Sequence, residues 1–253
     1  MLGVHADRQQ ITIRHEDVPG LMPGMTMTFP VATKELLTGR TPGELISARL
    51  EIGDAEGTLT EITRVGMAAL PAGTNAVAVA SGMLAVGDLL PDIALIDQHD
   101  RRRALSEWHG AMVLITFIYT RCPLPTFCPL MDQNFVTIQR GVEEDAVLRG
   151  RVKLVSISLD PEYDTPGVLA AHAARLKADP AVWTFLTGDR VTIDRAAGRF
   201  GVGVLRNPTV PTDITHNLRT VLAGADGRVV KIYASNDWTP GTVLSDLRAL
   251  RQP

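Results

Sequence analysis

The residues best suited to chemistry in this 253-residue chain are its two cysteines, Cys122 and Cys128. They lie between the apolar run 114–119, which predicts a buried strand, and a predicted helix over residues 130–140. This is a reactive position, because a helix dipole and the free N–H groups of the first helical turn favour a thiolate. Two cysteines this close suit a disulfide, a metal-binding pair or a redox dithiol, and their spacing does not decide among these.

A second group of residues with metal-binding chemistry lies near the start of the chain. Three of the eight methionines, Met22, Met25 and Met27, fall within six residues, and His15 precedes them. The alternation of residues 25–29 predicts a strand with Met25 and Met27 on one face. Thioether and imidazole groups are neutral ligands that suit Cu(I). The alternative is that these methionines fill a small core, and the nearby histidine favours metal binding.

The elements that position these two groups differ in kind. Short alternating runs predict strands at 10–13, 25–29, 45–50 and 58–62, so residues 1–66 are expected to form a small all-β barrel or sandwich. The Ala- and Gly-rich residues 67–83 are expected to be a linker. From residue 84 onward, the pattern predicts the order β-α-β-α-α-β-β-α, which is an α/β domain with a mixed sheet over residues 84–253.

Several local signals place the boundaries in this larger domain. Pro129 suits the first position of a helix, with Cys128 at or near the cap. Thr165 before a proline opens a helix to about residue 177, Asp189 caps one to about residue 200, and Thr239 before a proline opens the last, to about residue 250. The turn 224–227 between two apolar runs predicts a hairpin.

The bulk composition excludes some classes of function. The net charge of −3 argues against nucleic acid as a partner. The only basic run, 101–103, is interpreted as a solvated turn. No apolar run reaches about 18 residues, so no membrane-spanning helix is expected, and no signal peptide is recognised. A lone histidine is more often structural than a ligand, and this is the expectation for His99, His109 and His172.

The cysteine segment resembles that of the SCO/SenC copper chaperones, whose domain is thioredoxin-like. The resemblance spans about residues 84–252 and implies a copper site formed by Cys122, Cys128 and His216, with Asp213 and Thr215 near the histidine. Two thiolates and one imidazole suit Cu(I), whereas Zn²⁺ takes four ligands. The family usually has three residues between its cysteines, and this chain has five. The motifs that carry the resemblance are 87–92, 117–123, 158–165 and 183–188.

The methionine segment resembles the CusF-like periplasmic copper- and silver-binding domains, which are five-stranded OB-type barrels. The resemblance covers about residues 9–65 and includes Met-Thr-Met-Thr-Phe-Pro-Val at 25–31. It implies Cu(I) ligands at His15, Met25 and Met27. Some members have a tryptophan three residues before the first ligand methionine. Met22 occupies that place here, either as a further thioether ligand or as a hydrophobic lid.

These resemblances together imply a two-domain protein that binds copper, as Cu(I) or Cu(II), and delivers it to a client. The usual client of the family is an apo copper enzyme such as a cytochrome c oxidase subunit, and other copper carriers or thiol reductases are further expected partners. No nucleic-acid partner is expected. The expected location is periplasmic, with membrane contact only through an anchor absent from this sequence.

Other functions use the same cysteines. The main alternative is a thiol–disulfide oxidoreductase, with Cys122 and Cys128 as its catalytic residues, that keeps the copper-ligand cysteines of a client reduced. A peroxiredoxin-like peroxidase wants a threonine three positions before its reactive cysteine, and Thr120 is two positions before Cys122. A purely structural disulfide in a binding module is the remaining alternative.

Overall fold

The computed structural model divides into two compact units, one of Met1–Met83 with Thr215–Asn217 and one of Leu84–Ile214 with Leu218–Pro253. None of the helices in the described parts of the chain is long and apolar enough to cross a membrane. Most of the predicted linker 67–83 lies outside the described residues. The structure describes residues 1–6, 9–16, 26–52, 57–68, 83–206, 212, 214–236 and 238–250.

The first unit is a small all-β structure, as predicted. Three antiparallel strands pair in the order β1-β2-β3, and β4 pairs with β5. A parallel bridge between Val31 and Leu59 connects the two sheets. Ile11, Phe29 and Leu59 are almost fully buried in the core between them. The elements are β1 (Gly3–His5), β2 (Gln10–Arg14), β3 (Thr26–Pro30), the 3-10 turn η1 (Lys34–Leu37), β4 (Glu44–Ile52) and β5 (Gly57–Met67).

The second unit contains a seven-stranded mixed sheet in the order β14-β13-β8-β9-β10-β6-β7. The central strands β8, β9 and β10 are parallel, and the strands on either side of them are antiparallel to their neighbours. This confirms the predicted α/β class. The strands of this sheet are β6 (Ala94–Asp97), β7 (Arg102–Ala104), β8 (Met112–Ile118), β9 (Val152–Ser158), β10 (Trp183–Thr187), β13 (Arg219–Ala223) and β14 (Val229–Ala234).

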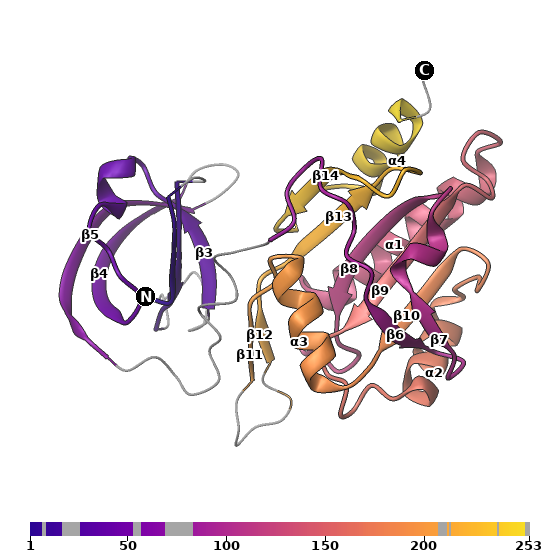
Figure 1. The fold of residues 1–253 in the computed structure, drawn as a ribbon, viewed down its shortest axis with the longest axis horizontal. Coiled ribbons are helices and arrows are strands. Elements are labelled where there is room, and N and C mark those ends of the chain that lie inside the picture. The colour runs from indigo at the N-terminus through magenta and orange to yellow at the C-terminus, as the bar shows by residue number, and fades with distance from the viewer. Residues whose placement is uncertain are drawn as a thin grey trace. The chain divides into compact units, whose positions relative to one another are not determined.

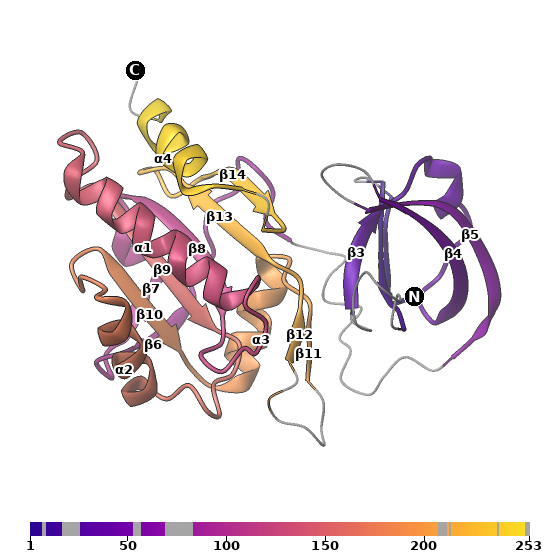
Figure 2. The same cartoon turned by 180° about the vertical axis from the view of Figure 1, so that it is seen from behind.

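Helices cover both faces of this sheet (Figures 1 and 2). Side chains of α1, α2 and α4 share one buried cluster, and those of α3 share the other. Successive residues of β8 alternate between these clusters, because neighbouring side chains in a strand point to opposite faces. The remaining elements of the unit are α1 (Cys128–Glu144), α2 (Pro166–Leu176), α3 (Arg190–Arg199), α4 (Pro240–Ala249), the 3-10 turn η2 (Leu105–Trp108) and strand β11 (Val204–Arg206). Strand β11 pairs with β12 (Ile214–His216), of which only Ile214 belongs to this unit.

The predicted helix starts are confirmed where a side chain caps the helix. Thr165, Asp189 and Thr239 each accept a hydrogen bond from a backbone N–H in the first turn of α2, α3 and α4. Helix α1 differs from the prediction. It begins at Cys128 itself after Phe127, which makes no side-chain cap, so Pro129 follows the first helical residue instead of occupying it.

The basic run 101–103 is exposed at Arg101 and Arg102, as expected, but it enters a strand instead of forming a turn. Arg102 begins strand β7, which pairs with β6. The guanidinium groups of Arg101 and Arg103 lie 3.0 and 3.5 Å from the carboxylate of Asp97, which is fully buried. The buried carboxylate is therefore paired with two cations.

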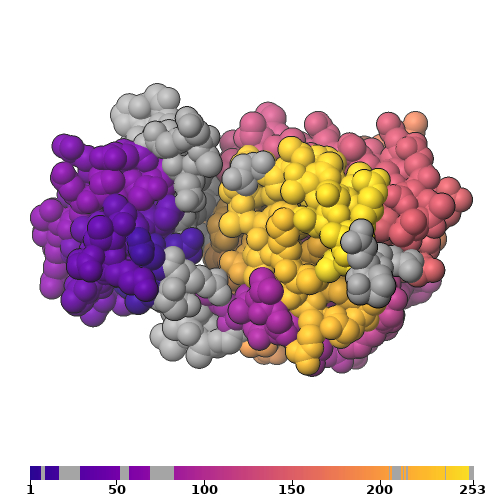
Figure 3. All heavy atoms as spheres, turned by 90° about the horizontal axis from the view of Figure 1, so that it is seen from above, coloured from indigo at the N-terminus to yellow at the C-terminus, as the bar shows by residue number. Residues whose placement is uncertain are grey.

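The last helix closes one side of the second unit. The yellow α4 lies on the surface close to the hairpin of β13 and β14 (Figure 3). Its Asp246 accepts hydrogen bonds from the Tyr233 hydroxyl at 2.6 Å and from Lys231 at 2.7 Å, both on β14. These bonds fix α4 to the end of β14.

Candidate copper and redox site

The loop between β8 and α1 brings the two cysteines together. Neither forms a disulfide, and their side chains are hydrogen-bonded to each other. Two turns bend the loop: Cys122 N–H donates to the Tyr119 carbonyl at 3.2 Å, and Phe127 N–H donates to the Leu124 carbonyl at 3.0 Å. Five intervening residues are therefore compatible with adjacent sulfurs.

The two thiols have unequal surroundings. Cys128 is 2% exposed, and Cys122 is half-buried. The hydrogen bond with Cys128 lowers the pKa of Cys122 to about 6, and the backbone N–H groups of Leu124 and Cys128 add to this effect. The same hydrogen bond and its burial raise the pKa of Cys128. At neutral pH the pair thus holds one thiolate, on the more exposed sulfur.

A buried polar network holds the start of the loop. Asp164 is fully buried and accepts hydrogen bonds from the Thr120 N–H at 3.0 Å, from the Thr120 hydroxyl, and from Ser158 Oγ at 2.5 Å. Asp160 accepts from Arg121 Nε at 2.6 Å, and Arg121 lies over the ring of Tyr163. The loop after β9 therefore fixes both residues that precede Cys122.

The segment 158–165 is one of the motifs that carry the resemblance, but the sequence analysis predicts no role at the site for Asp160 or Asp164. The feature that could have indicated such a role is a pair of acidic residues in the segment that follows a buried strand. They lie beside the cysteine loop because β8 and β9 are parallel neighbours whose ends meet at one edge of the sheet. Their contacts are with backbone and with neighbouring side chains, so they support the site.

His216 ends strand β12 and is 6% exposed. Its Nδ1 donates to the Asn217 carbonyl at 3.1 Å, so the lone pair of the neutral ring is on Nε2. Burial lowers the pKa of His216 to about 4. The ring is therefore neutral at pH 7, as a metal ligand must be.

Residues on either side of His216 reach the cysteine region. Strand β13 pairs antiparallel with β8, with Thr220 opposite Thr116, so the chain just before β13 returns to the end of β8. Ile214 and Leu218 are buried in the same cluster as Cys128.

The structure brings the two cysteines together without gathering them and His216 into one cluster. Among the residues that the structure describes, no three His, Cys, Asp or Glu side chains gather in a way that could hold a metal. His216 as a ligand therefore stays a prediction. Asp213 lies outside the described residues, and Thr215 is described only as a position in β12.

In the first unit, His15 directly follows β2. Its Nδ1 donates to the Glu16 carbonyl at 2.7 Å. Its ring and that of Phe29 are arranged edge to face, with their centres 5.8 Å apart. Its Nε2 is buried and has no hydrogen-bond partner in the described part of the chain, which suits a metal ligand. Met27 of β3 pairs with Ile13 of β2, and Ile13 lies two residues before His15 in the sequence. Met22 and Met25 lie outside the described residues.

His172 has a structural role. It is buried, and its Nε2 lies 2.9 Å from Asp132 of α1, which confirms the expectation that it is structural.

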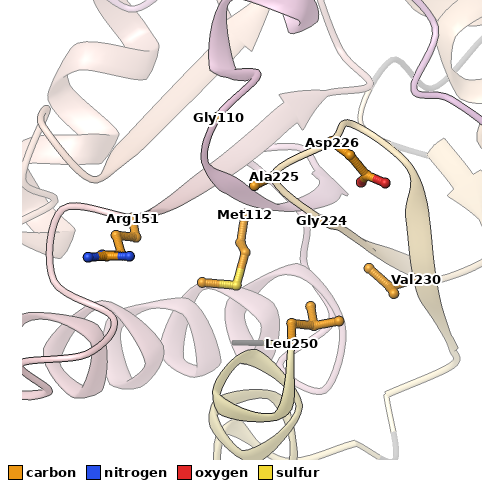
Figure 4. Close-up of a pocket in the computed structure, with 8 residues that line it drawn as sticks. All are labelled: Gly110, Met112, Arg151, Gly224, Ala225, Asp226, Val230 and Leu250. Carbon is orange, nitrogen blue, oxygen red and sulfur yellow. The ribbon is translucent and has the colours of Figure 1, made fainter. Parts of the chain in front are cut away.

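A cavity of about 350 Å³ lies at the opposite end of β8 from the cysteines, and Figure 4 shows the residues that line it. Met112, the first residue of β8, lines it together with Arg151 and Asp226. The cavity is therefore separate from the cysteine site.

Comparison with known proteins agrees with this geometry. The SCO1/SenC family model matches residues 85–252, and the model described as copper binding periplasmic protein CusF matches residues 3–64. A SCO1 protein homolog of Bacillus subtilis is 28% identical over 60% of this chain and 78% of that protein. A putative copper-binding protein of Stutzerimonas stutzeri is 26% identical over 54% of this chain and 65% of that protein.

Solved structures show the same relationship. Copper-bound ScoI of Bradyrhizobium japonicum is 28% identical with a TM-score of 0.53, covering 66% of this chain and 99% of that one. BsSco, described as a member of the Sco family of cytochrome c oxidase assembly proteins with a disulfide switch, is 25% identical with a TM-score of 0.53, covering 66% and 96%. The family match spans more than half of the sequence, and the chain belongs to the SCO1/SenC family.

Proposed function

We propose that this protein is a copper carrier with two copper sites. At the cysteine site the ligands are Cys122, Cys128 and His216. In the first unit they are His15 and the thioethers of Met25 and Met27, with Met22 as a further ligand or a lid. The observation that carries the proposal is the convergence of the two sulfurs at the start of α1 across five intervening residues.

Copper fits the donor set of the cysteine site. A thiolate, a thiol that releases its proton when a metal binds, and a neutral imidazole make a soft set of three, which suits Cu(I) better than Zn²⁺. Ile214 and Leu218, which lie two residues before and after His216, are buried in the cluster that contains Cys128. The copper-bound relative supports the same metal.

The chemistry of the two donor sets gives the transfer a direction. Neutral thioethers bind Cu(I) without charge compensation, whereas a thiolate pair adds Coulomb attraction. Copper therefore passes from the methionine site to the cysteine site and then to a client. The client proposed is a respiratory copper enzyme, such as the copper centre of cytochrome c oxidase, outside the cytoplasm. The description of BsSco and the periplasmic CusF match support this assignment.

A second candidate function is thiol–disulfide exchange with a client, and the inequality of the thiols favours it. The Cys122 thiolate, half-buried and with a pKa of about 6, attacks a client disulfide and releases one client thiolate. Cys128 then displaces the second client sulfur, forming the Cys122–Cys128 disulfide while the client gains two electrons. A thiol reductant resets the pair.

The peroxidase alternative is disfavoured by the same site. The hydroxyl of Thr120 donates to the buried carboxylate of Asp164, so it is committed to the support of the loop. The threonine of a peroxidase site instead has to meet the reactive sulfur.

Copper stoichiometry tests the proposal. The reduced chain, titrated with Cu(I) under anaerobic conditions, is expected to bind two equivalents. Met25→Leu combined with Met27→Leu removes one and spares the other. His216→Ala weakens the remaining site and leaves disulfide formation intact. Loss of both sites in the methionine variant would contradict the two-site proposal, and unchanged affinity in His216→Ala would exclude this histidine as a ligand.

A further inference from the structure

The turn after β14 is hydrogen-bonded to both chain segments that carry the proposed ligands of the cysteine site. The N–H of Ser235 donates to the Leu218 carbonyl at 3.1 Å. The side-chain amide of Asn236 donates to the Thr126 carbonyl at 2.9 Å. Leu218 lies two residues after His216, and Thr126 lies between the two cysteines. Two adjacent residues therefore bridge segments that are about 90 residues apart in sequence.

This turn is held firmly on both sides. Tyr233 before it and Trp238 after it are 5% and 7% exposed, and their rings lie 5.6 Å apart. The Tyr233 hydroxyl is fixed to Asp246 of α4. Ser235 itself has a φ of 67°, a left-handed conformation that costs energy in any residue except glycine. The surrounding packing therefore imposes the turn.

The hydrogen bond from Asn236 attaches the exposed tip of the cysteine loop to the turn after β14. Pro125 and Thr126, at its tip, are exposed, and its two turns are formed within the loop itself. The bond from Asn236 ties the tip to a segment 110 residues away. A loop with more residues has more conformations to lose, so an external bond to its tip has more effect.

We propose that Ser235 and Asn236 act as a clasp that holds the cysteine loop and the His216 segment in register for copper. Asn236 is a positioning residue in this proposal, acting through the Thr126 carbonyl, and it does not bind the metal. The inference rests on the proposed ligand set of Cys122, Cys128 and His216.

The clasp affects copper binding more than disulfide formation. Copper needs donors from both segments, and holding them in place before binding removes part of the ordering cost. A disulfide needs only the two sulfurs of one loop. Removal of one hydrogen bond of this kind is expected to weaken copper binding about threefold to tenfold.

Asn236→Ala, studied in the full chain alone and combined with His216→Ala, tests the clasp. The Asn236 change is expected to lower the Cu(I) affinity of the cysteine site about threefold to tenfold, measured by competition with a Cu(I) chelator. In the His216→Ala background the same change should have less than a twofold effect, because the second segment no longer contributes a ligand.

A control variant separates the clasp from general loosening of the fold. Gln139→Ala also removes a side-chain amide bond to a backbone carbonyl, at Lys177, together with the bond that the Asp179 N–H donates to the same side chain, and it is expected to leave copper affinity unchanged. An equal loss in Gln139→Ala, or an equal Asn236 effect in both His216 backgrounds, would overturn the clasp.

Hydrogen exchange gives a readout that does not depend on copper. The amides of Leu124, Thr126 and Phe127 are expected to exchange about threefold to tenfold faster in Asn236→Ala than in the unaltered chain, and unchanged exchange there would also overturn the clasp. A chain that binds no copper at its cysteines, yet shows this faster exchange, would contradict the proposed function and support the clasp as a device that orders the loop.

Discussion

The two proposed copper sites differ in what prepares their ligands. In the second unit, a buried network around Asp164 fixes the loop before Cys122, and the two thiols share a hydrogen bond. In the first unit, His15 is oriented by its own neighbour Glu16 and by the edge of Phe29, both local contacts. The cysteine site is thus built by tertiary structure, whereas the histidine of the first site is positioned by one pair of strands.

The ligand chemistry differs in the same sense. Thiolates carry charge, release protons on binding metal and are lost when a disulfide forms. Thioethers carry no charge and bind without losing a proton. The cysteine site should therefore be lost when its disulfide forms or when its buried support is damaged, and the methionine site should be lost in neither case.

The largest expected effect is the selective loss of one site. In the variant Cys122→Ser with Cys128→Ser, one of two Cu(I) equivalents should disappear, because both thiolates are gone, and the methionine site should keep its affinity. Mild oxidation of the unaltered chain to its disulfide should have the same result. Metal analysis after gel filtration measures both. Retention of two equivalents would show that the cysteines are not copper ligands.

The next largest expected effect is a difference in alkylation rate between the two thiols. Iodoacetamide should modify Cys122 at least about 100-fold faster than Cys128 at pH 7, because Cys128 is 2% exposed and protonated. The Cys122 rate should rise with pH and reach half its maximum near pH 6, where its thiolate forms. Mass spectrometry of peptides follows both. Similar rates at the two positions would contradict the described loop.

The buried support of the loop should contribute measurably to stability. Asp164→Ala leaves three donors without their acceptor and is expected to lower the free energy of unfolding of the second unit by about 3 kcal/mol. Calorimetry would show a midpoint lower by roughly 10 °C. The matched control, Asp194→Ala, removes a half-exposed partner of Arg206 and should cost less than about 1 kcal/mol. The methionine site should bind copper normally in both variants.

The smallest effect concerns His216 and pH. Its pKa is about 4 in the folded chain, against 6.5 for an ordinary histidine, so the unfolded chain binds this proton first as pH falls. Copper-free protein should therefore lose stability between pH 6.5 and pH 4, by about 1–2 kcal/mol at pH 5. His216→Gln should remove this contribution to the loss of stability, so the melting temperature should fall less between pH 7 and pH 5 than it does in the unaltered chain. An equal fall in both proteins would argue against a buried neutral ring.

The sequence was most informative where a boundary depends on local chemistry. The caps Thr165, Asp189 and Thr239 lie where they were expected, because a side chain that bonds the first turn acts within four residues. The predicted order lacks strands β6, β7 and β10, although residues 183–188 are among the motifs that carry the resemblance. Five buried residues without alternation do not distinguish a strand from other buried segments.

The site itself could be predicted only in part. The cysteines and His216 were identified by type and resemblance, and the adjacency of the sulfurs required the fold of the loop. Asp164 supports Thr120 from 44 residues away, and Asn236 reaches Thr126 from 110 residues away. Such contacts depend on which strands are neighbours and on their register, and a single sequence contains no direct record of either.

The exposed tip of the cysteine loop has a consequence for recognising related proteins. Its two ends are anchored by β8 and α1, whereas Pro125 and Thr126 project outward. Insertions at such a tip disturb no buried group and leave the fold intact, although they would move the carbonyl that Asn236 holds. Motif searches that demand a fixed interval between the cysteines would overlook chains like this one, and a search for two cysteines that bracket a strand-to-helix junction, at any short interval, would retrieve them.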